Sequence, residues 1–364
     1  MTHPEARSVT EAVAERRERV NRAIEAELPI ARPERLYEAS RYLLDAGGKR
    51  LRPAVLLLTA EALCDVEPLS TDYREFPTLD ANAGRGSAND ADGTRRAPAT
   101  IDVMRAAVAI ETIQSFTLIH DDIMDDDDLR RGVPAVHREY DLETAILAGD
   151  TLYSKAFEIM LESGARPDRG LEALRTLART CTRICEGQSF DVEFEHRDDV
   201  GEAEYLEMVE LKTAVLYGAA ASVPATLLGA DDRTIEAVYR YGIDIGKAFQ
   251  IQDDVLDLTV PSDVLGKQRG SDLVEGKRTL ITLHAREQGV DPDALVDATD
   301  PEAVSEAEID AAVSRLESVG SIAYAREAAE SLVREGKDEL GVLPENEARD
   351  QLEAVADYLI ERGY

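Results

Sequence analysis

Lysine is scarce in this sequence of 364 residues. It occurs only at positions 49, 155, 212, 247, 267, 277 and 337, so arginine supplies most of the positive charge. The 41 Lys and Arg residues face 74 Asp and Glu residues, which gives a formal net charge of −33 at pH 7. This acid excess excludes a general nucleic-acid binder, because phosphate backbones are bound by basic patches. The same excess, with arginine preferred to lysine, indicates adaptation to high salt, where screening weakens self-repulsion.

Cysteine is also rare. Cys64, Cys181 and Cys185 form an odd and sparse set, which argues against a disulfide framework and for a reducing cytoplasm. No further Cys or His completes a zinc site, so we expect Cys181 and Cys185 to be small core residues. The polar N-terminus does not have the pattern of a signal peptide. The longest weakly apolar run, 214–230, is broken by Pro224, which indicates a buried helix and no membrane span.

Strand-like alternation of apolar and polar residues is missing as well. Apolar residues recur instead at helical spacing, which predicts an all-α fold in a single domain over 1–364. The region at about 65–100 is rich in Asp, Asn, Gly and Pro, and is predicted to be a polar acidic loop. The expected helices cover 9–28, with Ser8 or Thr10 as its cap, then 34–46, 53–63, 101–125, 142–161, 171–194, 205–228, 233–258, 279–287 and several segments after 293.

Aspartate is abundant, and two clusters of it stand out. The stretch 120–131 holds six aspartates followed by two arginines, and a second cluster lies at 252–257. Both contain Asp-Asp-x-x-Asp at the end of an apolar helix, so Asp121 and Asp125 lie one turn apart, as do Asp253 and Asp257. Like charges at this spacing repel, and Mg²⁺ between them reverses the effect, because it binds one or two carboxylates together with substrate phosphates. We therefore expect the two motifs to face each other across one pocket and hold a diphosphate.

Composition alone offers an alternative for either motif. In so acidic a chain, one Asp-Asp-x-x-Asp would arise by chance in roughly one sequence in three, as part of a solvated face. Two copies that each end an apolar helix are rarer by about an order of magnitude. The few lysines favour phosphate binding, since Lys49, Lys212, Lys267 and Lys277 stand beside glycine or threonine.

A set of ordered motifs carries a resemblance to a known family. They are Gly-Gly-Lys-Arg-Leu-Arg-Pro at 47–53, Asp-Asp-Ile-Met-Asp at 121–125, Arg-Arg-Gly-x-Pro at 130–134, Gly149-Asp150, Gly187-Gln188-x-x-Asp191, Lys212-Thr213, Phe249-Gln250 before the second aspartate motif, and Gly266-Lys267. The sequence resembles the trans-isoprenyl diphosphate synthases (polyprenyl synthetases), and most of all the haloarchaeal short-chain geranylgeranyl diphosphate synthases. The resemblance implies a helical bundle around a deep central cavity, usually in a homodimer or higher homo-oligomer. It also implies head-to-tail condensation of isopentenyl diphosphate with dimethylallyl, geranyl or farnesyl diphosphate.

The resemblance also implies a role for each motif residue. Two or three Mg²⁺ ions would be bound by Asp121, Asp122, Asp125, Asp253, Asp254 and Asp257. The allylic diphosphate would be held by Arg130, Lys212, Thr213, Gln250, Lys267 and Lys277, of which Lys212, Thr213 and Gln250 would also support catalysis. Isopentenyl diphosphate would be held by Lys49, Arg52, Gln114 and Arg131. Gln114 departs from the family, which usually has a histidine there; an amide can donate a hydrogen bond but carries no charge.

Product length is expected to depend on residues upstream of Asp121. Phe116 lies five residues back, about 7.5 Å along a helix, and in this family an aromatic residue there forms the floor of the pocket. Thr117 beside it is small, and Ile113 lies one turn deeper. This pattern predicts a twenty-carbon product, geranylgeranyl diphosphate. Alternatives are that Phe116 is an ordinary core residue and that the product is farnesyl diphosphate or a mixture.

Other functions stay open on the sequence alone. A terpene cyclase shares an aspartate-rich motif, but its second metal site usually combines Asn, Ser or Thr, and Glu. A non-catalytic regulatory relative would not need both aspartate motifs. An acidic calcium-binding or interaction protein would generally use loop carboxylates and more oxygen ligands.

Overall fold

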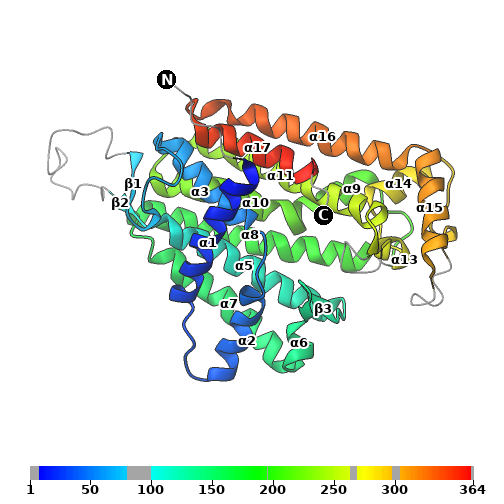
Figure 1. Ribbon diagram of the computed structural model, residues 1–364, viewed down its shortest axis with the longest axis horizontal. Helices are drawn as coiled ribbons and strands as arrows, with labels where there is room; N and C mark the ends of the chain where they lie inside the picture. The colour runs from blue at the N-terminus through cyan, green and yellow to red at the C-terminus, as the bar shows by residue number, and fades with distance from the viewer. Residues whose placement is uncertain (1–7, 80–99, 195, 263–268, 297–303, 362–364) are drawn as a thin grey trace. The chain divides into compact units, whose positions relative to one another are not determined.

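The computed structural model describes residues 8–79, 100–194, 196–262, 269–296 and 304–361. The predicted contact of Lys267 and most of the predicted loop at 65–100 lie outside these residues. Helices make up nearly all of the regular structure, so the all-α prediction is confirmed (Figure 1). The helices are α1 (Val9–Glu27), α2 (Glu34–Asp45), α3 (Leu51–Cys64), α5 (Val103–Met124), α6 (Val136–Glu139), α7 (Leu142–Leu161), α8 (Pro167–Phe194), α9 (Glu202–Val209), α10 (Val215–Leu228), α11 (Asp232–Thr259), α13 (Ser271–Val274), α14 (Leu280–Glu287), α15 (Glu306–Ser318), α16 (Ser321–Glu339) and α17 (Glu347–Glu361).

Short elements complete the described chain. The strands are β1 (Phe76–Pro77), β2 (Thr100–Ile101), β3 (Leu129–Arg130) and β4 (Val133–Pro134), which form two antiparallel pairs, β1 with β2 and β3 with β4. Three 3₁₀ turns, η1 (Tyr73–Glu75), η3 (Pro292–Ala294) and η5 (Leu340–Val342), and a π-helical segment, η2 (Glu210–Ala214), are also present. The described ends of the 65–100 region therefore contain η1 and a strand pair, which the sequence could not predict because strands of two residues show no alternation of apolar and polar residues.

The described chain divides into two compact units. The first comprises Met1–Cys181, Gly218–Tyr239 and Leu340–Val355. Its central element is α5, which packs against α7, α3 and α1, and α2 packs against α7 (Figure 1). Helix α5 is apolar on most of its surface, so it is buried on several sides. Asp102 ends it on the N-terminal side by accepting a hydrogen bond from the Arg105 amide, 2.9 Å away.

The second unit comprises Thr182–Tyr217, Arg240–Glu339 and Ala356–Tyr364. Within it, α14 packs against α9 and α16, and α15 packs against α16. The predicted helix over 205–228 is present, but it is interrupted by the π-helical turn of η2, which contains Lys212 and Thr213.

In both units, polar side chains cap the starts of helices. Thr279 caps α14 by accepting a hydrogen bond from the Thr282 amide, and Ser8 caps α1 in a capping box with Glu11.

The three cysteines differ in burial. Cys64 and Cys181 are buried, but Cys185 is exposed, so the prediction that Cys185 is a core residue was wrong. Helix α8 has one apolar face, and Cys185 falls beyond its edge.

One helical stretch, Glu202–Leu228, is long and apolar enough to cross a membrane, but 89% of its apolar window is buried within the protein. That burial identifies it as a core helix.

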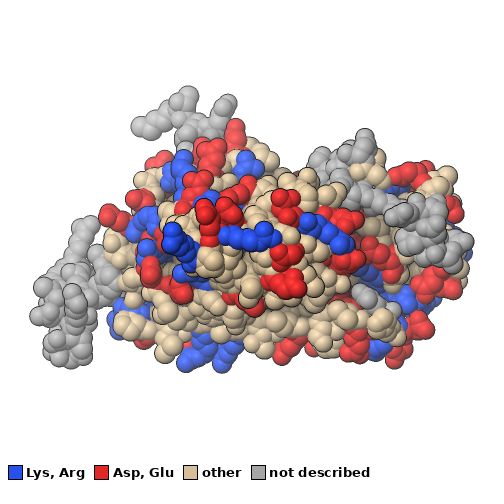
Figure 2. All heavy atoms as spheres, turned by 90° about the horizontal axis from the view of Figure 1, so that it is seen from below, with Lys and Arg blue, Asp and Glu red and all other residues tan. Residues whose placement is uncertain are grey.

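Charged side chains on the surface pair with one another. Figure 2 shows acidic and basic side chains interspersed on the face that it presents. Arg197, for example, contacts the carboxylates of Asp199 at 2.9 Å and Glu204 at 3.0 Å. Arginine is suited to such contacts, because its planar guanidinium has five donors and can bond several carboxylates at once.

Candidate functional site

The first aspartate motif lies at the C-terminal end of α5. Asp121 is half-buried, Asp122 is fully buried and Asp125 is exposed as the residue that caps the helix. The Asp125 amide donates to the Asp121 carbonyl, 2.8 Å away, so these two residues are one helical turn apart, as predicted. Their carboxylates leave the last turn on a common face, where they can hold a cation jointly.

Asp122 has a separate environment. Its Oδ1 accepts from Arg130 at 2.5 Å, while Oδ2 accepts no hydrogen bond from the described residues. Burial raises the pKa of Asp122, and the nearby Arg130 opposes that rise. A buried carboxylate oxygen without a donor is costly, so it is a suitable ligand for a cation. Arg130 also contacts Asp127 at 2.7 Å, and is thus held on the aspartate cluster.

The loop before α3 and the β3–β4 hairpin lie together. Arg131, at the tip of the hairpin, donates to the carbonyls of Leu43, 3.2 Å away, and Gly47. Gly48 has φ 139°, a conformation that favours glycine, and a Cβ atom there would lie 2.9 Å from the Arg131 guanidinium carbon. Burial lowers the pKa of Arg131; Glu111 opposes this, and Arg50, Arg130 and Arg52 add to it. Arg50, Arg52 and Arg130 thus lie close enough to Arg131 to repel its charge, and Glu111 partly compensates.

The predicted chain-length residues lie along α5. The Phe116 side chain is half-buried, and its ring packs edge-on against His120 and against Tyr153 of α7, with centroids 5.0 Å and 5.3 Å apart. Thr117 is buried, and Ile113 is fully buried. Because a helix turns about 100° per residue, Phe116 lies about 140° around α5 from Asp121, while Thr117 lies about 40° away. Thr117 is therefore nearer than Phe116 to the face of α5 that carries Asp121. Phe116 lies on another side of the helix, where its ring forms an aromatic row with Tyr153 and Phe157.

Lys212 and Thr213 lie in the π-helical segment, a feature often found at functional sites. The Lys212 ammonium is 2.5 Å from Oδ2 of Asp191 on α8. Two glycines allow close approach to this segment: a Cβ on Gly187 would be 2.2 Å from the Lys212 amide nitrogen, and one on Gly246 would be 2.6 Å from the Ala214 Cα. The segment is thereby held between α8 and α11.

A chain of hydrogen bonds joins Thr213 to the second aspartate motif. The Thr213 hydroxyl donates to Gln250 Oε1 at 3.0 Å, and Gln250 Nε2 donates to Asp254 Oδ1 at 3.0 Å. Tyr205 donates to the other Asp254 oxygen at 2.6 Å. Burial, and then the Asp272 carboxylate, raise the pKa of Asp254 well above its usual range. With both oxygens already hydrogen-bonded, Asp254 fixes the orientation of the Gln250 amide.

The other residues of the second motif differ in exposure. Asp253 is half-buried, whereas Asp257 is buried and accepts from the Ser271 hydroxyl at 2.9 Å and the Asp272 amide at 3.2 Å. Lys277 is half-exposed and lies 2.9 Å from Glu275. Within the described residues, no group of three or more His, Cys, Asp or Glu side chains is arranged to hold a metal ion unaided. Each aspartate pair would need further ligands, as Mg²⁺ obtains from water and phosphate.

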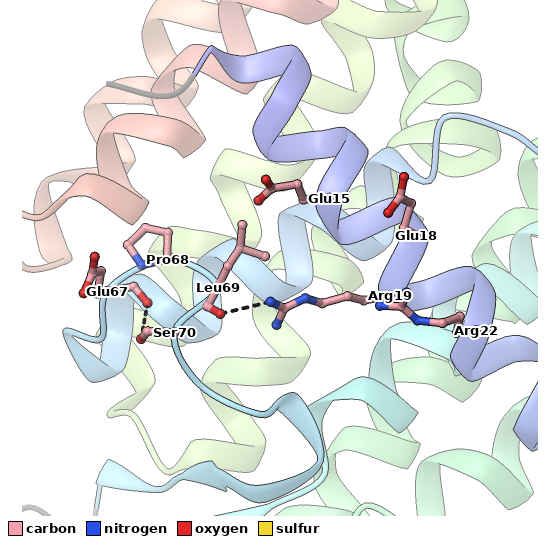
Figure 3. Close-up of a pocket in the computed structure, with 8 residues that line it drawn as sticks. All are labelled: Glu15, Glu18, Arg19, Arg22, Glu67, Pro68, Leu69 and Ser70. Carbon is pink, nitrogen blue, oxygen red and sulfur yellow. Dashed lines mark hydrogen bonds between the residues drawn. The ribbon is translucent and has the colours of Figure 1, made fainter. Parts of the chain in front are cut away.

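A pocket of about 440 Å³ lies elsewhere in the first unit, between α1 and the turn at 67–70 (Figure 3). Arg19 reaches across it and donates to the Leu69 carbonyl at 3.0 Å. Three carboxylates, those of Glu15, Glu18 and Glu67, line the pocket with the two arginines Arg19 and Arg22. None of the predicted site residues takes part in it.

Three residues with a structural role at the site were not given one from the sequence. Asp191 belongs to a quoted motif, but its partner Lys212 could not be inferred from spacing. Glu111 and Tyr205 were not singled out. The signal for Glu111 was present, because a lone glutamate in the apolar run of α5 implies a buried counter-charge. Nothing in the local sequence marks Tyr205.

Comparison with known proteins shows the family of this chain. A family model described as polyprenyl synthetase matches residues 33–316. A geranylfarnesyl diphosphate synthase from Natronomonas pharaonis is 67% identical over 98% of each chain, and a geranylgeranyl diphosphate synthase from Methanosarcina mazei is 48% identical over 98% of this chain and 99% of its own. Among solved structures, the geranylgeranyl pyrophosphate synthetase of Geoglobus acetivorans has a TM-score of 0.81 at 44% identity, covering 96% of this chain and 99% of that one. The chain therefore belongs to the polyprenyl synthetase family and is a prenyltransferase that joins isopentenyl diphosphate to an allylic diphosphate.

Proposed function

We propose that this enzyme makes geranylgeranyl diphosphate in a Mg²⁺-dependent reaction, with the residue roles predicted above. One observation carries the assignment of the two substrate sites. Arg130 contacts Asp122 of the first aspartate motif. The next residue, Arg131, contacts the Gly47 carbonyl of the loop before α3, which carries Lys49. The sites proposed for the allylic and the isopentenyl diphosphates are thus joined through one peptide bond.

The chemistry requires heterolysis of an allylic C–O bond. The leaving diphosphate gathers negative charge, so cationic groups fixed in advance around it lower the barrier. Mg²⁺ ions, two or three when bound, would supply most of that charge from the two aspartate motifs. Lys212 adds a fixed ammonium, since Asp191 holds it in place. Both aspartate motifs are proposed to act on the same diphosphate.

The allylic cation needs electron-rich neighbours that do not trap it. The Thr213 hydroxyl and the Gln250 amide oxygen are hydrogen-bonded to each other, so both oxygens are placed and neither is a strong nucleophile. Isopentenyl diphosphate attacks through its double bond from about 3–3.5 Å. The new C–C bond leaves a tertiary cation, which loses a proton from the adjacent carbon to the released diphosphate and so forms the new double bond. Exclusion of water prevents hydrolysis of the cation to an alcohol.

The metal sites are tested by removing one carboxylate from each motif. Asp121→Ala and Asp253→Ala should each lower turnover by at least about a hundredfold, with the helical circular dichroism retained. The measurement is Mg²⁺-dependent release of diphosphate from isopentenyl and farnesyl diphosphates. Asp198→Asn, at an exposed residue outside both motifs, is the control. Near-normal turnover in both alanine variants would contradict the two-motif proposal.

One comparison favours a product longer than twenty carbons. The relative that is 67% identical is named a geranylfarnesyl diphosphate synthase, and the wall nearest the aspartates carries the small Thr117. A twenty-five-carbon product is therefore the alternative to the twenty-carbon one. Chromatography of dephosphorylated products from each allylic primer decides between them.

We also propose a homodimer in the reducing interior of the cell. Helix α7 exposes several large apolar side chains, namely Leu142, Ile146, Leu147, Tyr153 and Leu161. Exposed apolar surface of this kind is typical of an interface between subunits. Light scattering of the protein in its working salt should give twice the mass of the chain, and Leu147→Glu should lower it. A monomer before mutation would contradict the proposal.

A further inference from the structure

Glu111 is a buried carboxylate that none of the proposed roles uses. It lies on α5, ten residues before Asp121, and is 3% exposed. A carboxylate in such a position is unstable unless cations and hydrogen bonds compensate for its lost hydration. The compensation comes from two arginines that are distant in sequence from Glu111 and from each other, Arg50 and Arg131.

Arg50 is the closer partner. Its Nη1 lies 2.5 Å from Glu111 Oε1, its Nε donates to Asn21 Oδ1 at 2.9 Å, and its Nη2 donates to the Leu44 carbonyl at 2.5 Å. All three nitrogens of the guanidinium are therefore engaged, on α1, the end of α2 and α5. Although it follows Lys49 in the Gly-Gly-Lys-Arg motif, Arg50 is buried and does not extend towards solvent.

Arg131 approaches the same oxygen from the hairpin. Its Nη2 lies 3.8 Å from Glu111 Oε1, and its Nη1 donates to the carbonyls of Leu43 in α2 and Gly47 in the loop. Glu111 is thus the anion shared by the segment 47–52, which comprises the loop before α3 and the first two residues of α3, and by the tip of the hairpin. The carboxylate oxygen that holds the loop also holds the hairpin against it.

Both arginines have an unusual backbone. Arg50 has φ 51° and Arg131 has φ 56°, which is the left-handed region that side chains other than glycine rarely adopt. Such conformations persist only where surrounding contacts enforce them. The contacts here converge on Glu111, so its charge stabilises the turn that places Lys49 and Arg52 on either side of Arg50.

We infer that Glu111 is a positioning residue for the isopentenyl diphosphate site, because it fixes Arg50 and Arg131 and through them the segment 47–52, which carries Lys49 in the loop and Arg52 in the first turn of α3. The inference rests on the proposed function of that loop. Glu111 does not touch the substrate, so its removal should act on the binding of one substrate only. The allylic side should be unaffected, because Asp122 and Asp127 hold Arg130 and Asp191 holds Lys212 without Glu111.

The test compares two buried glutamates of the first unit. Glu111→Gln keeps the side-chain volume and removes the charge. Glu61→Gln is the matched control, because the Glu61 side chain is 1% exposed and pairs with the buried Arg16, away from the 47–52 loop. Both variants should lose stability to urea. Only Glu111→Gln should raise the KM for isopentenyl diphosphate, by about tenfold or more, with the KM for farnesyl diphosphate within about twofold of the original.

A third variant keeps the test informative if Glu111→Gln does not fold. Glu111→Asp keeps the charge and withdraws it by about 1.5 Å, one carbon–carbon bond. It should raise the KM for isopentenyl diphosphate less than Glu111→Gln does. An unchanged KM in a folded Glu111→Asp or Glu111→Gln protein, or an equal rise in Glu61→Gln, overturns the inference.

Lys49→Ala and Arg52→Ala separate this inference from the proposal on which it rests. If neither raises the KM for isopentenyl diphosphate, the assignment of the loop is wrong. If both raise it and the Glu111 variants do not, the loop is correctly assigned and only the role of Glu111 is wrong.

Discussion

The ammonium of Lys212 lies 2.5 Å from the carboxylate of Asp191, which is on a different helix. Lys212 is thus held from α8, while its backbone is in the π-helical turn. Lys212→Ala should lower kcat by about a hundredfold, because a fixed cation near the leaving diphosphate is lost. Asp191→Asn should lower it less, by about tenfold, since the lysine remains but is no longer held. Single-turnover rates with farnesyl diphosphate measure both.

Lys337→Ala is the control for these variants, because Lys337 also pairs with a carboxylate, that of Asp357 at 2.8 Å, but belongs to no motif. Its turnover should match the original. A larger loss in Asp191→Asn than in Lys212→Ala would mean that Asp191 has a function of its own.

Tyr205→Phe should loosen the support of Gln250. The lost hydroxyl leaves an oxygen of the buried Asp254 without its donor, which costs about 1.5–3 kcal/mol of stability. The Gln250 amide then loses its fixed orientation, and turnover should fall by about tenfold while the KM for isopentenyl diphosphate is unchanged. Thermal unfolding and steady-state kinetics measure the two effects.

The matched variant is Tyr324→Phe, because the Tyr324 hydroxyl donates to Glu202 at 2.8 Å on the partly buried surface of the same unit. It should change neither turnover nor KM. Equal losses of turnover in both tyrosine variants would show that Tyr205 acts through general stability.

Changes at Phe116 and Thr117 test product length. Phe116→Ala removes one member of the aromatic row with Tyr153 and Phe157, and should yield products longer than twenty carbons if Phe116 forms the floor. Thr117→Phe places an aromatic ring about 40° from the aspartates around α5 and should shorten the product to fifteen carbons. Chromatography of the dephosphorylated products measures both. An unchanged distribution in active Phe116→Ala enzyme would place the floor elsewhere, and a response to Thr117→Phe alone would assign it to the other face.

Stability should depend on pH through Asp244. Burial, with Glu335, Glu339 and Glu210 nearby and Lys247 opposing, raises the pKa of Asp244 to about 6. Its folded pKa is above the unfolded value, so the stability it contributes is present at about pH 4 and is lost as pH rises through 6. Asp244→Asn should therefore raise the Tm at pH 8, and this gain should disappear towards pH 4. Asp338→Asn, at an exposed residue of α16, should show no such trend.

The order of the helices could be predicted from periodicity and capping residues, as α7 at Leu142–Leu161 illustrates, because these signals are local. The β3–β4 hairpin and α6 could not, since strands of two residues and a helix of four produce no periodic signal. The exposure of Cys185 was also missed, because helical spacing shows which residues share a face but not where the buried part of that face ends.

At the site, the candidate residues could be chosen from motif spacing, but their partners could not. The aspartates of the second motif are identical in type, yet Asp253 is half-buried while Asp254 is buried beneath Tyr205 and Gln250. That difference arises from α9, which is far away in sequence. The same holds for Glu111, whose importance depends on two arginines brought to it by the fold.

The π-helical turn at Glu210–Ala214 makes the length of this segment important, independently of which residues it contains. A π-turn corresponds to an α-helix with one residue inserted. Deleting one residue there would restore the regular pitch, and would turn Tyr205 relative to Val215 by about 100° with a shift of 1.5 Å. The Tyr205 hydroxyl and the Thr213 hydroxyl could then no longer donate at the same time to Asp254 and to Gln250, respectively. Lineages of this enzyme should therefore accept substitutions in this segment far more readily than a change in its length.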